Sequence, residues 1–378
     1  MSRKTEYYIN TLVALIYNWE PAPELGSCIN KLYKLSKEHT MSVMIGSFIK
    51  SRYPEGYTDK IKEETALRTA LHIMQKTEYK ILAAELDRRK IKYIPIKGIR
   101  LCEMYPKNML REMSDVDILV HPEDIEAITE IMTENGYEHS HAGHHEIYIN
   151  ENNVCFEIHT RLIDEKRNNR LGTYFDGVWQ YALKCGNGSC YVLSPEDEYI
   201  YLLAHLYGHF HMGGCGVRYI LDIWIYLQEN LDMDFEVVGK TLKLYKLNRF
   251  ADNISRLGMA WFGGKKPDEI TDALGEYIIN SGTHGRTNQY SLAVSGEEKT
   301  AMASVLKRKL FLTGDEMKKR YPWIRYRPLI PIGYIYRAFD MAVHKREKID
   351  EYTKSVAGVN KQSVREYKKM MEKFGVKE

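Results

Sequence analysis

The sequence has no long apolar run, and this absence limits what kind of protein it can encode. No stretch of its 378 residues approaches the roughly 20 consecutive apolar residues that a membrane-spanning helix requires. Residues 1–7 are polar, so we expect no secretory signal sequence there. We therefore expect a soluble, cytoplasmic protein without a membrane partner.

The sequence also has no large excess of charge of either sign. Lys and Arg total 54 and Asp and Glu total 51, which gives a formal net charge of +3. Such a balance lacks the positive field that draws proteins to nucleic acids, so nucleic acid is not the expected partner. Basic runs at 307–309 and 318–320, followed by aromatic residues, could form an RNA-binding surface, but we favour a solvated helix face.

Recognised zinc motifs are missing. None of the six cysteines forms a C-x-x-C pair, and Cys185 and Cys190 are too far apart for a zinc half-site. His205 and His209 have the i, i+4 spacing of zinc ligands, but Leu206 stands where the H-E-x-x-H motif has glutamate. We therefore expect reduced thiols that pack as small hydrophobic residues, and structural or substrate-facing roles for the two histidines.

The segment 92–120, in contrast, combines two β-prone runs with a glycine turn and a pair of carboxylates. Residues 93–96 and 116–120 are β-prone runs, and the first is broken at Gly98. Side chains alternate across a strand, so Asp115 and Asp117 should point to the same face. Two carboxylates on one face repel each other, and a shared divalent cation is the commonest reason for this arrangement.

A third carboxylate lies on a predicted strand further along the chain. In residues 154–162 the pattern places Val154, Phe156 and Ile158 on one face. Glu157 and His159 then share the opposite face. We expect Glu157 to join the two aspartates in a single metal site, within a catalytic core that holds all three.

These features occur in a particular order: Lys97-Gly98, Tyr105-Pro106, Arg111, the run 114–120, and then Glu157-Ile158-His159. In this order they resemble the nucleotidyltransferase superfamily with the DNA polymerase β-like core, and more closely its bacterial branch of uncharacterised nucleotidyltransferases. The resemblance covers residues 65–230 well and the two ends only loosely.

The resemblance implies an α+β fold with a small mixed β-sheet. It places the catalytic core at 91–193, an N-terminal helical region at 1–90 and a C-terminal helical region at 194–378. It implies metal-dependent transfer of a nucleoside monophosphate from a nucleoside triphosphate such as ATP, with release of pyrophosphate. The acceptor, whether a small molecule, a sugar phosphate or a protein, is not identified by any motif.

The resemblance also implies how the carboxylates act. Asp115 and Asp117 would bridge two Mg²⁺ (or Mn²⁺) ions, and Glu157 would hold the ion that activates the acceptor. The structural alternative is that Asp115 caps the start of the strand and Asp117 is a structural charge. For the enzyme, we expect Asp115→Ala or Asp117→Ala to abolish transfer and, by relieving repulsion, to raise the stability of the metal-free protein.

Six further residues are predicted to bind the nucleotide: Lys97, Gly98, Arg111, Ser114, His159 and Arg218. Gly98 would let the backbone approach phosphate oxygens. Better-known relatives carry Gly-Ser at this turn, where this sequence has Lys97-Gly98-Ile99. Lys97 could supply a point charge to phosphate or lie in solvent. Arg111 could contact the triphosphate, neutralise the acidic cluster or form a structural ion pair.

The flanking helices offer fewer signals. Residues 59–90 predict one long helix whose buried stripe includes Leu67, Ile81, Leu82 and Leu86. Residues 194–230 should form the other wall of the cleft. There Arg218 and Asp222 are four residues apart, which predicts either an exposed helix pair worth a few tenths of a kcal/mol or a lining role.

Two questions stay open at this level. Four histidines, at 139, 141, 144 and 145, crowd one predicted hairpin and could form a metal site, border the site, or simply be exposed. The chain could also be a non-catalytic, nucleotide-binding regulatory or partner module with the same fold. The intact Asp115, Asp117 and Glu157 favour an enzyme, because a binding module has no need of charges that repel one another without metal.

Overall fold

The computed structural model divides the chain into two compact units. One comprises residues 1–208 and 216–279, and the other comprises 209–215 and 280–378. The structure describes residues 2–17, 28–142, 145–163, 172–211, 213–282, 317, 331–337 and 361–376. The predicted basic runs at 307–309 and 318–320 lie outside the described residues.

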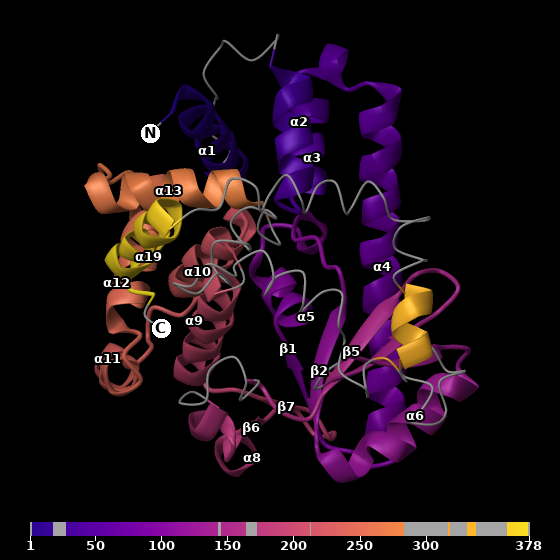
Figure 1. The fold of residues 1–378 in the computed structure, drawn as a ribbon. Helices are drawn as coiled ribbons and strands as arrows, with labels where there is room; N and C mark the ends of the chain where they lie inside the picture. The colour runs from indigo at the N-terminus through magenta and orange to yellow at the C-terminus, as the bar shows by residue number, and fades with distance from the viewer. Residues whose placement is uncertain are drawn as a thin grey trace. The chain divides into compact units, whose positions relative to one another are not determined.

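The first unit contains a sheet and most of the described helices (Figure 1). Its helices before the sheet are α1 (Arg3–Tyr17), α2 (Ile29–Glu38), α3 (Ser42–Arg52) and α4 (Asp59–Arg88). The helices after the sheet are α9 (Pro195–His211), α10 (Val217–Glu229), α11 (Phe235–Leu244), α12 (Asn248–Trp261) and α13 (Glu269–Ser281). The ends of α9 and α13, at 209–211 and 280–281, belong to the second unit. No helix among the described residues combines the length and the apolarity needed to cross a membrane.

The second unit is described over fewer residues. Its helix α19 spans Lys361–Phe374. The Tyr367 hydroxyl donates a hydrogen bond of 3.5 Å to the carbonyl oxygen of Phe210. This contact ties α19 to the short segment 209–215 of the same unit.

The sheet has five strands and is mixed, which confirms the predicted fold class. The strands are β1 (Tyr93–Ile96), β2 (Val116–Val120), β3 (Glu138–Ala142), β4 (His145–Ile149) and β5 (Cys155–His159). Their order is β1-β2-β5-β4-β3. Strands β2 and β5 are parallel, and the other neighbours are antiparallel. The parallel pair carries two of the predicted carboxylates, Asp117 and Glu157, and Asp115 lies just before β2.

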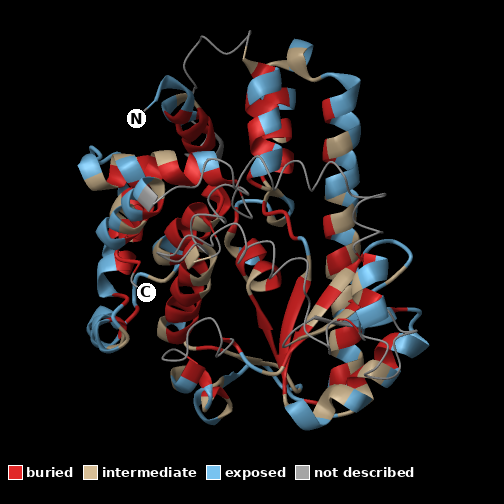
Figure 2. Cartoon of the chain, in the orientation of Figure 1, coloured by how far each residue is buried: buried red, intermediate tan, exposed pale blue. Residues whose placement is uncertain are grey.

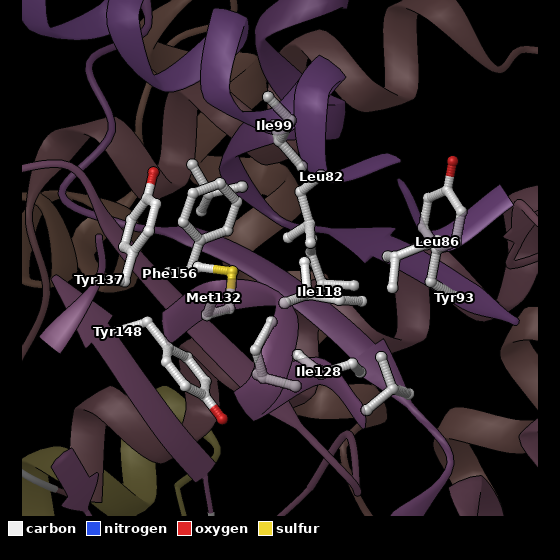
Figure 3. Close-up of a cluster of buried hydrophobic side chains, with 14 of the residues drawn as sticks. Leu82, Leu86, Tyr93, Ile99, Ile118, Ile128, Met132, Tyr137, Tyr148 and Phe156 are labelled. Carbon is white, nitrogen blue, oxygen red and sulfur yellow. The ribbon is translucent and has the colours of Figure 1, made fainter. Parts of the chain in front are cut away.

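One face of the sheet is hydrophobic and is covered by α4 and by α6 (Ile125–Glu134) (Figure 3). Ile118 of β2 and Phe156 of β5 project into this cluster, where they meet Leu82 of α4 and Met132 of α6. Burial of each such side chain contributes about 1.5–3 kcal/mol. Because strand side chains alternate, this packing holds the intervening polar residues on the opposite face.

Helix α4 does not bury the stripe that its hydrophobic residues predict. Leu82 and Leu86 are buried, but Leu67 is 70% exposed and Ile81 is 51% exposed. The buried positions, which recur at helical spacing, are Ile61, Thr65, His72, Gln75, Leu82 and Leu86. Figure 2 shows the exposed side of this helix. The prediction was wrong for Leu67 and Ile81 because part of the buried face of α4 is polar.

Three short elements connect β1 to β2, and this segment reaches the C-terminal helices. Helix α5 (Gly98–Leu101) follows β1, and the 3₁₀ turns η2 (Cys102–Met104) and η3 (Asn108–Leu110) come next. Arg100 of α5 lies 3.2 Å from a carboxylate oxygen of Glu198 in α9. The Tyr105 hydroxyl donates a 2.7 Å hydrogen bond to Asp222 of α10. Both helices are thereby attached to the segment that leads into the carboxylate strand.

Candidate functional site

Asp117 lies in the middle of the row of side chains that crosses the sheet. In the register of the strands it pairs with Ile96 of β1 on one side and with Glu157 of β5 on the other. Its neighbour Ile118 and the Phe156 next to Glu157 fill the hydrophobic cluster behind the sheet. Asp117 and Glu157 therefore share the opposite face, as the alternation of β5 predicts.

The Asp117 carboxylate is buried but well partnered. Its Oδ1 atom lies 2.6 Å from the Lys97 ammonium and 2.7 Å from Nε2 of His159. Only 2% of Asp117 is exposed. Burial opposes ionisation, but the Lys97 charge and the His159 hydrogen bond hold the pKa of Asp117 well below its usual range. Asp117 is therefore ionised, and not protonated, at neutral pH.

Three side chains converge here in a manner suited to a metal ion. Asp117, Glu157 and His159 each offer one ligand atom, and these atoms all lie within 4.8 Å of one another. Nε2 of His159 is 3.6 Å from Glu157 Oε2, and Nε2 of His145 in β4 is 3.5 Å from Glu157 Oε1. Carboxylate oxygens suit Mg²⁺ and Mn²⁺, and an imidazole nitrogen favours transition metals such as Mn²⁺. The donor set therefore fits a divalent cation.

Asp115 lies just before β2 and is partly exposed. Burial and the negative charge of Asp117 raise the pKa of Asp115 to about 6, although Lys97 and Arg218 act in the opposite direction. Among the residues that the structure describes, the three-ligand group does not extend to Asp115. The structure thus brings together two of the three predicted carboxylates and adds His159, with Asp115 beside them. Ser114, which precedes Asp115, is exposed.

Lys97 is neither a solvent-exposed lysine nor an ordinary strand residue. It connects β1 to α5 with φ +53° and ψ −121°, a backbone conformation that residues other than glycine rarely adopt. Its ammonium is paired with Asp117. Such strain persists only where the surroundings enforce it, and it is often found at functional sites.

Gly98 is needed for close packing. A Cβ atom added at this position would lie 2.6 Å from Nη1 of Arg111 and 2.9 Å from Cγ of Met113. Arg111 is buried and forms a two-pronged ion pair with Asp222, through Nη2–Oδ2 at 2.9 Å and Nε–Oδ1 at 3.2 Å. Of the roles left open for Arg111, the structure shows the ion pair, and Gly98 makes room for its guanidinium.

Arg218 is buried, contrary to the exposed helix pair considered above. It is 7% exposed, and its Nη1 donates a 2.7 Å hydrogen bond to the carbonyl oxygen of Glu112. Among the described residues it forms no ion pair with Asp222, because that carboxylate is bound by Arg111 and Tyr105. The spacing of Arg218 and Asp222 predicted a mutual pair, but their partners come from the segment before β2. The buried Nε of Arg218 has no hydrogen-bond partner within the described part of the chain.

Two supporting residues could not be found from the sequence. The Glu112 carboxylate accepts hydrogen bonds from Ser42 Oγ at 3.0 Å and from the Val43 amide at 2.8 Å, which fastens α3 to the segment before Asp115. Tyr201 of α9 is buried; burial raises its pKa, Lys97 lowers it, and the negative charge of Asp117 raises it further. Tyr201 therefore lies within electrostatic reach of the site, and α9 borders it. No local pattern distinguishes either residue.

The histidine-rich hairpin reaches the site through one residue. His139 is exposed, pairs with Glu146 at 2.7 Å and stacks on the buried ring of Tyr148. The ring of His145 lies beside that of His159, with centroids 5.0 Å apart. The His141 side chain and His144 lie outside the described residues. The hairpin therefore borders the site through His145, which is one of the alternatives considered above.

His205, which could have been a zinc ligand, lies among aromatic rings. Its ring centroid is 6.2 Å from that of Tyr201 and 6.1 Å from that of Tyr219. Within the described part of the chain, no group of three potential metal ligands includes His205.

Comparison with known proteins gives one family match and one similar structure. The model of a family described as "uncharacterised nucleotidyltransferase" matches residues 27–263, which is more than half of the chain and includes every site residue described above. A solved structure, of an antigenic nucleotidyltransferase-like protein from Paracoccidioides brasiliensis, is similar at 20% sequence identity with a TM-score of 0.29. That similarity covers 41% of this chain and 76% of the other. No functionally curated protein matches the chain.

Proposed function

The chain belongs to the uncharacterised nucleotidyltransferase family, and on this premise we propose that it is a metal-dependent enzyme. It would transfer a nucleoside monophosphate from a nucleoside triphosphate to an acceptor and release pyrophosphate. The acceptor class, whether a small molecule, a sugar phosphate or a protein side chain, is not specified by any contact described above.

One observation supports this proposal most strongly. Asp117, Glu157 and His159 place their ligand atoms within 4.8 Å of one another, on two adjacent parallel strands. A divalent cation bound there would supply electrostatic stabilisation for the charge that develops on the transferred phosphoryl group and on the leaving pyrophosphate. By the resemblance, two ions would share Asp115 and Asp117.

The residues of the chain have distinct tasks in this proposal. Asp117 is kept ionised by its partners and is therefore ready to bind Mg²⁺ or Mn²⁺ at neutral pH. Glu157, on the neighbouring strand, would hold the metal on the acceptor side and accept the proton of the attacking group. Lys97 and the unpartnered Nε of Arg218 would offer donors to phosphate oxygens.

The second candidate is a non-catalytic, nucleotide-binding regulatory or partner module. The Lys97–Asp117 ion pair favours it, since a carboxylate that is already neutralised by an ammonium does not require a metal. Calorimetric titration with ATP, in the presence and absence of Mg²⁺, together with an assay of pyrophosphate release in cell extract, separates the two.

The enzyme should bind ATP more tightly with Mg²⁺ and should release pyrophosphate. Glu157→Gln should abolish that release, whereas Glu146→Gln on the neighbouring strand, whose partner is His139, should retain it. Tight ATP binding that is independent of metal, without pyrophosphate release from any of the four nucleoside triphosphates, would support the binding module instead.

A further inference from the structure

Lys97 lies on only one of the two sides of Asp117. In the register of the sheet, Asp117 lies between Ile96 of β1 and Glu157 of β5, and Lys97 immediately follows Ile96. The Lys97 side chain returns to the same row, with its ammonium 2.6 Å from Asp117 Oδ1. The β1 side of Asp117 thus already has a cation, and that cation is part of the chain.

The β5 side has a different character. Glu157 and His159 both lie there, and with Asp117 they form the three-ligand group described above. That group provides the ligands of one ion. Asp117 Oδ1 is already approached by both Lys97 and His159, at 2.6 and 2.7 Å. A second ion on the β1 side would have to displace the Lys97 ammonium from this oxygen.

The backbone of Lys97 is fixed in a strained conformation. Its φ of +53° and ψ of −121° are unfavourable for any residue with a Cβ atom. The Lys97 carbonyl oxygen nevertheless accepts hydrogen bonds from the amides of Leu101 at 2.8 Å and Arg100 at 3.1 Å, which fix the turn. The side chain is only 17% exposed, so it is not a lysine that moves freely in solvent.

We propose that Lys97 occupies one of the two cationic positions of the site, so that each chain binds a single divalent ion through Asp117, Glu157 and His159. This inference rests on the proposed function, and it replaces the two ions implied by the resemblance. An ammonium has three donors, so Lys97 can hold Asp117 and also donate to a phosphate oxygen of the nucleotide.

The test is a count of bound Mn²⁺ ions per chain. The full-length, metal-free protein is titrated with Mn²⁺ in the presence of α,β-methylene-ATP, and free Mn²⁺ is followed by electron paramagnetic resonance. We expect one bound Mn²⁺ per wild-type chain, with no magnetic coupling between ions. Lys97→Met, which keeps the length of the side chain and removes its charge, should bind a second Mn²⁺.

Lys92→Met is the matched control, because Lys92 precedes the same strand and lies over the ring of Tyr191 instead of in the site. It should bind one ion, as the wild type does. Two coupled Mn²⁺ ions in the wild-type protein would overturn the inference without any need for a variant, and so would a folded Lys97→Met protein that still binds one ion. Absence of Mn²⁺ binding in all three proteins would contradict the proposed function itself.

Discussion

The two aspartates of the site should respond in opposite directions when their charges are removed. The sequence pattern alone predicts that loss of either charge stabilises the metal-free protein. The structure contradicts this for Asp117, because its carboxylate is paired with Lys97 and His159. Asp115 is not a member of the three-ligand group. Its pKa is raised to about 6.

The sign for Asp115 follows from linkage. A carboxyl group whose pKa is higher in the folded than in the unfolded chain stabilises the fold below the unfolded pKa, and this contribution is lost as the pH rises through the folded value. The rise from 3.8 to about 6 corresponds to roughly 2–3 kcal/mol, since one pKa unit is about 1.4 kcal/mol. Asp115→Asn should therefore raise the free energy of unfolding at pH 8 by up to that amount, and should change it little at pH 4.

Asp117→Asn has the opposite effect because it leaves the buried Lys97 ammonium without its counter-charge. Loss of one partner of a buried pair typically costs about 3–5 kcal/mol. Because the pKa of Asp117 is lowered in the fold, its contribution is present above the unfolded pKa and is lost as the pH falls through the folded value. The destabilisation should therefore be large at pH 8.

Urea denaturation of both variants and the wild type, at pH 8 in the presence of a chelator, measures the difference directly. The Asp115→Asn midpoint should move to higher urea and the Asp117→Asn midpoint to lower urea. An Asp117→Asn midpoint at or above the wild-type value would refute the assignment of Lys97 as the partner of Asp117. An Asp115→Asn midpoint at lower urea would instead refute the raised pKa of Asp115.

Three further predictions concern the segment that supports the site. Asp222→Asn should lower the free energy of unfolding by about 3–5 kcal/mol, because it leaves Arg111 buried without its counter-charge. Urea denaturation measures this loss, and the double variant Arg111→Met/Asp222→Leu should be less destabilised than Asp222→Asn alone. Gly98→Ala should lower the free energy of unfolding by about 1–3 kcal/mol in the same assay, since the added Cβ would lie 2.6 Å from Arg111 Nη1. An unchanged urea midpoint would show that Arg111 moves aside freely. Arg218→Ala should lower the free energy of unfolding by about 1–3 kcal/mol, because it removes the hydrogen bond to Glu112. This loss is larger than the few tenths of a kcal/mol of an exposed helix pair. A thermal melt identical to that of the wild type would contradict the burial of Arg218.

The face of the sheet on which the site lies could be predicted from local patterns. Alternation along the strands placed Asp117 and Glu157 on the face opposite Phe156, because a strand exposes one face to the core and the other to the site. The mixed sheet with helical flanks was implied by the family resemblance, which the order of the motifs carries. Strand alternation, in contrast, is a property of short segments, so the sequence alone specifies it.

The partners of the charged residues could not be predicted in the same way. Arg111 and Asp222 are far apart in sequence, and only the packing of α10 against the segment before β2 brings them together. The four-residue spacing of Arg218 and Asp222 suggested a local pair, but tertiary partners replaced it. Lys97 is similar: its contact with Asp117 depends on a backbone conformation that no propensity favours for lysine.

The central claim, nucleotidyl transfer, is tested most directly by comparing two labels in one nucleotide. The protein is incubated with cell extract, Mg²⁺ or Mn²⁺, and ATP labelled with ³²P at either the α or the γ phosphate. We predict that an acceptor gains label from α-labelled ATP only, that γ label appears in pyrophosphate, and that Asp117→Asn and Glu157→Gln abolish both. Label that reaches the acceptor from the γ position, or α-label transfer that continues in both variants, would contradict the proposed function.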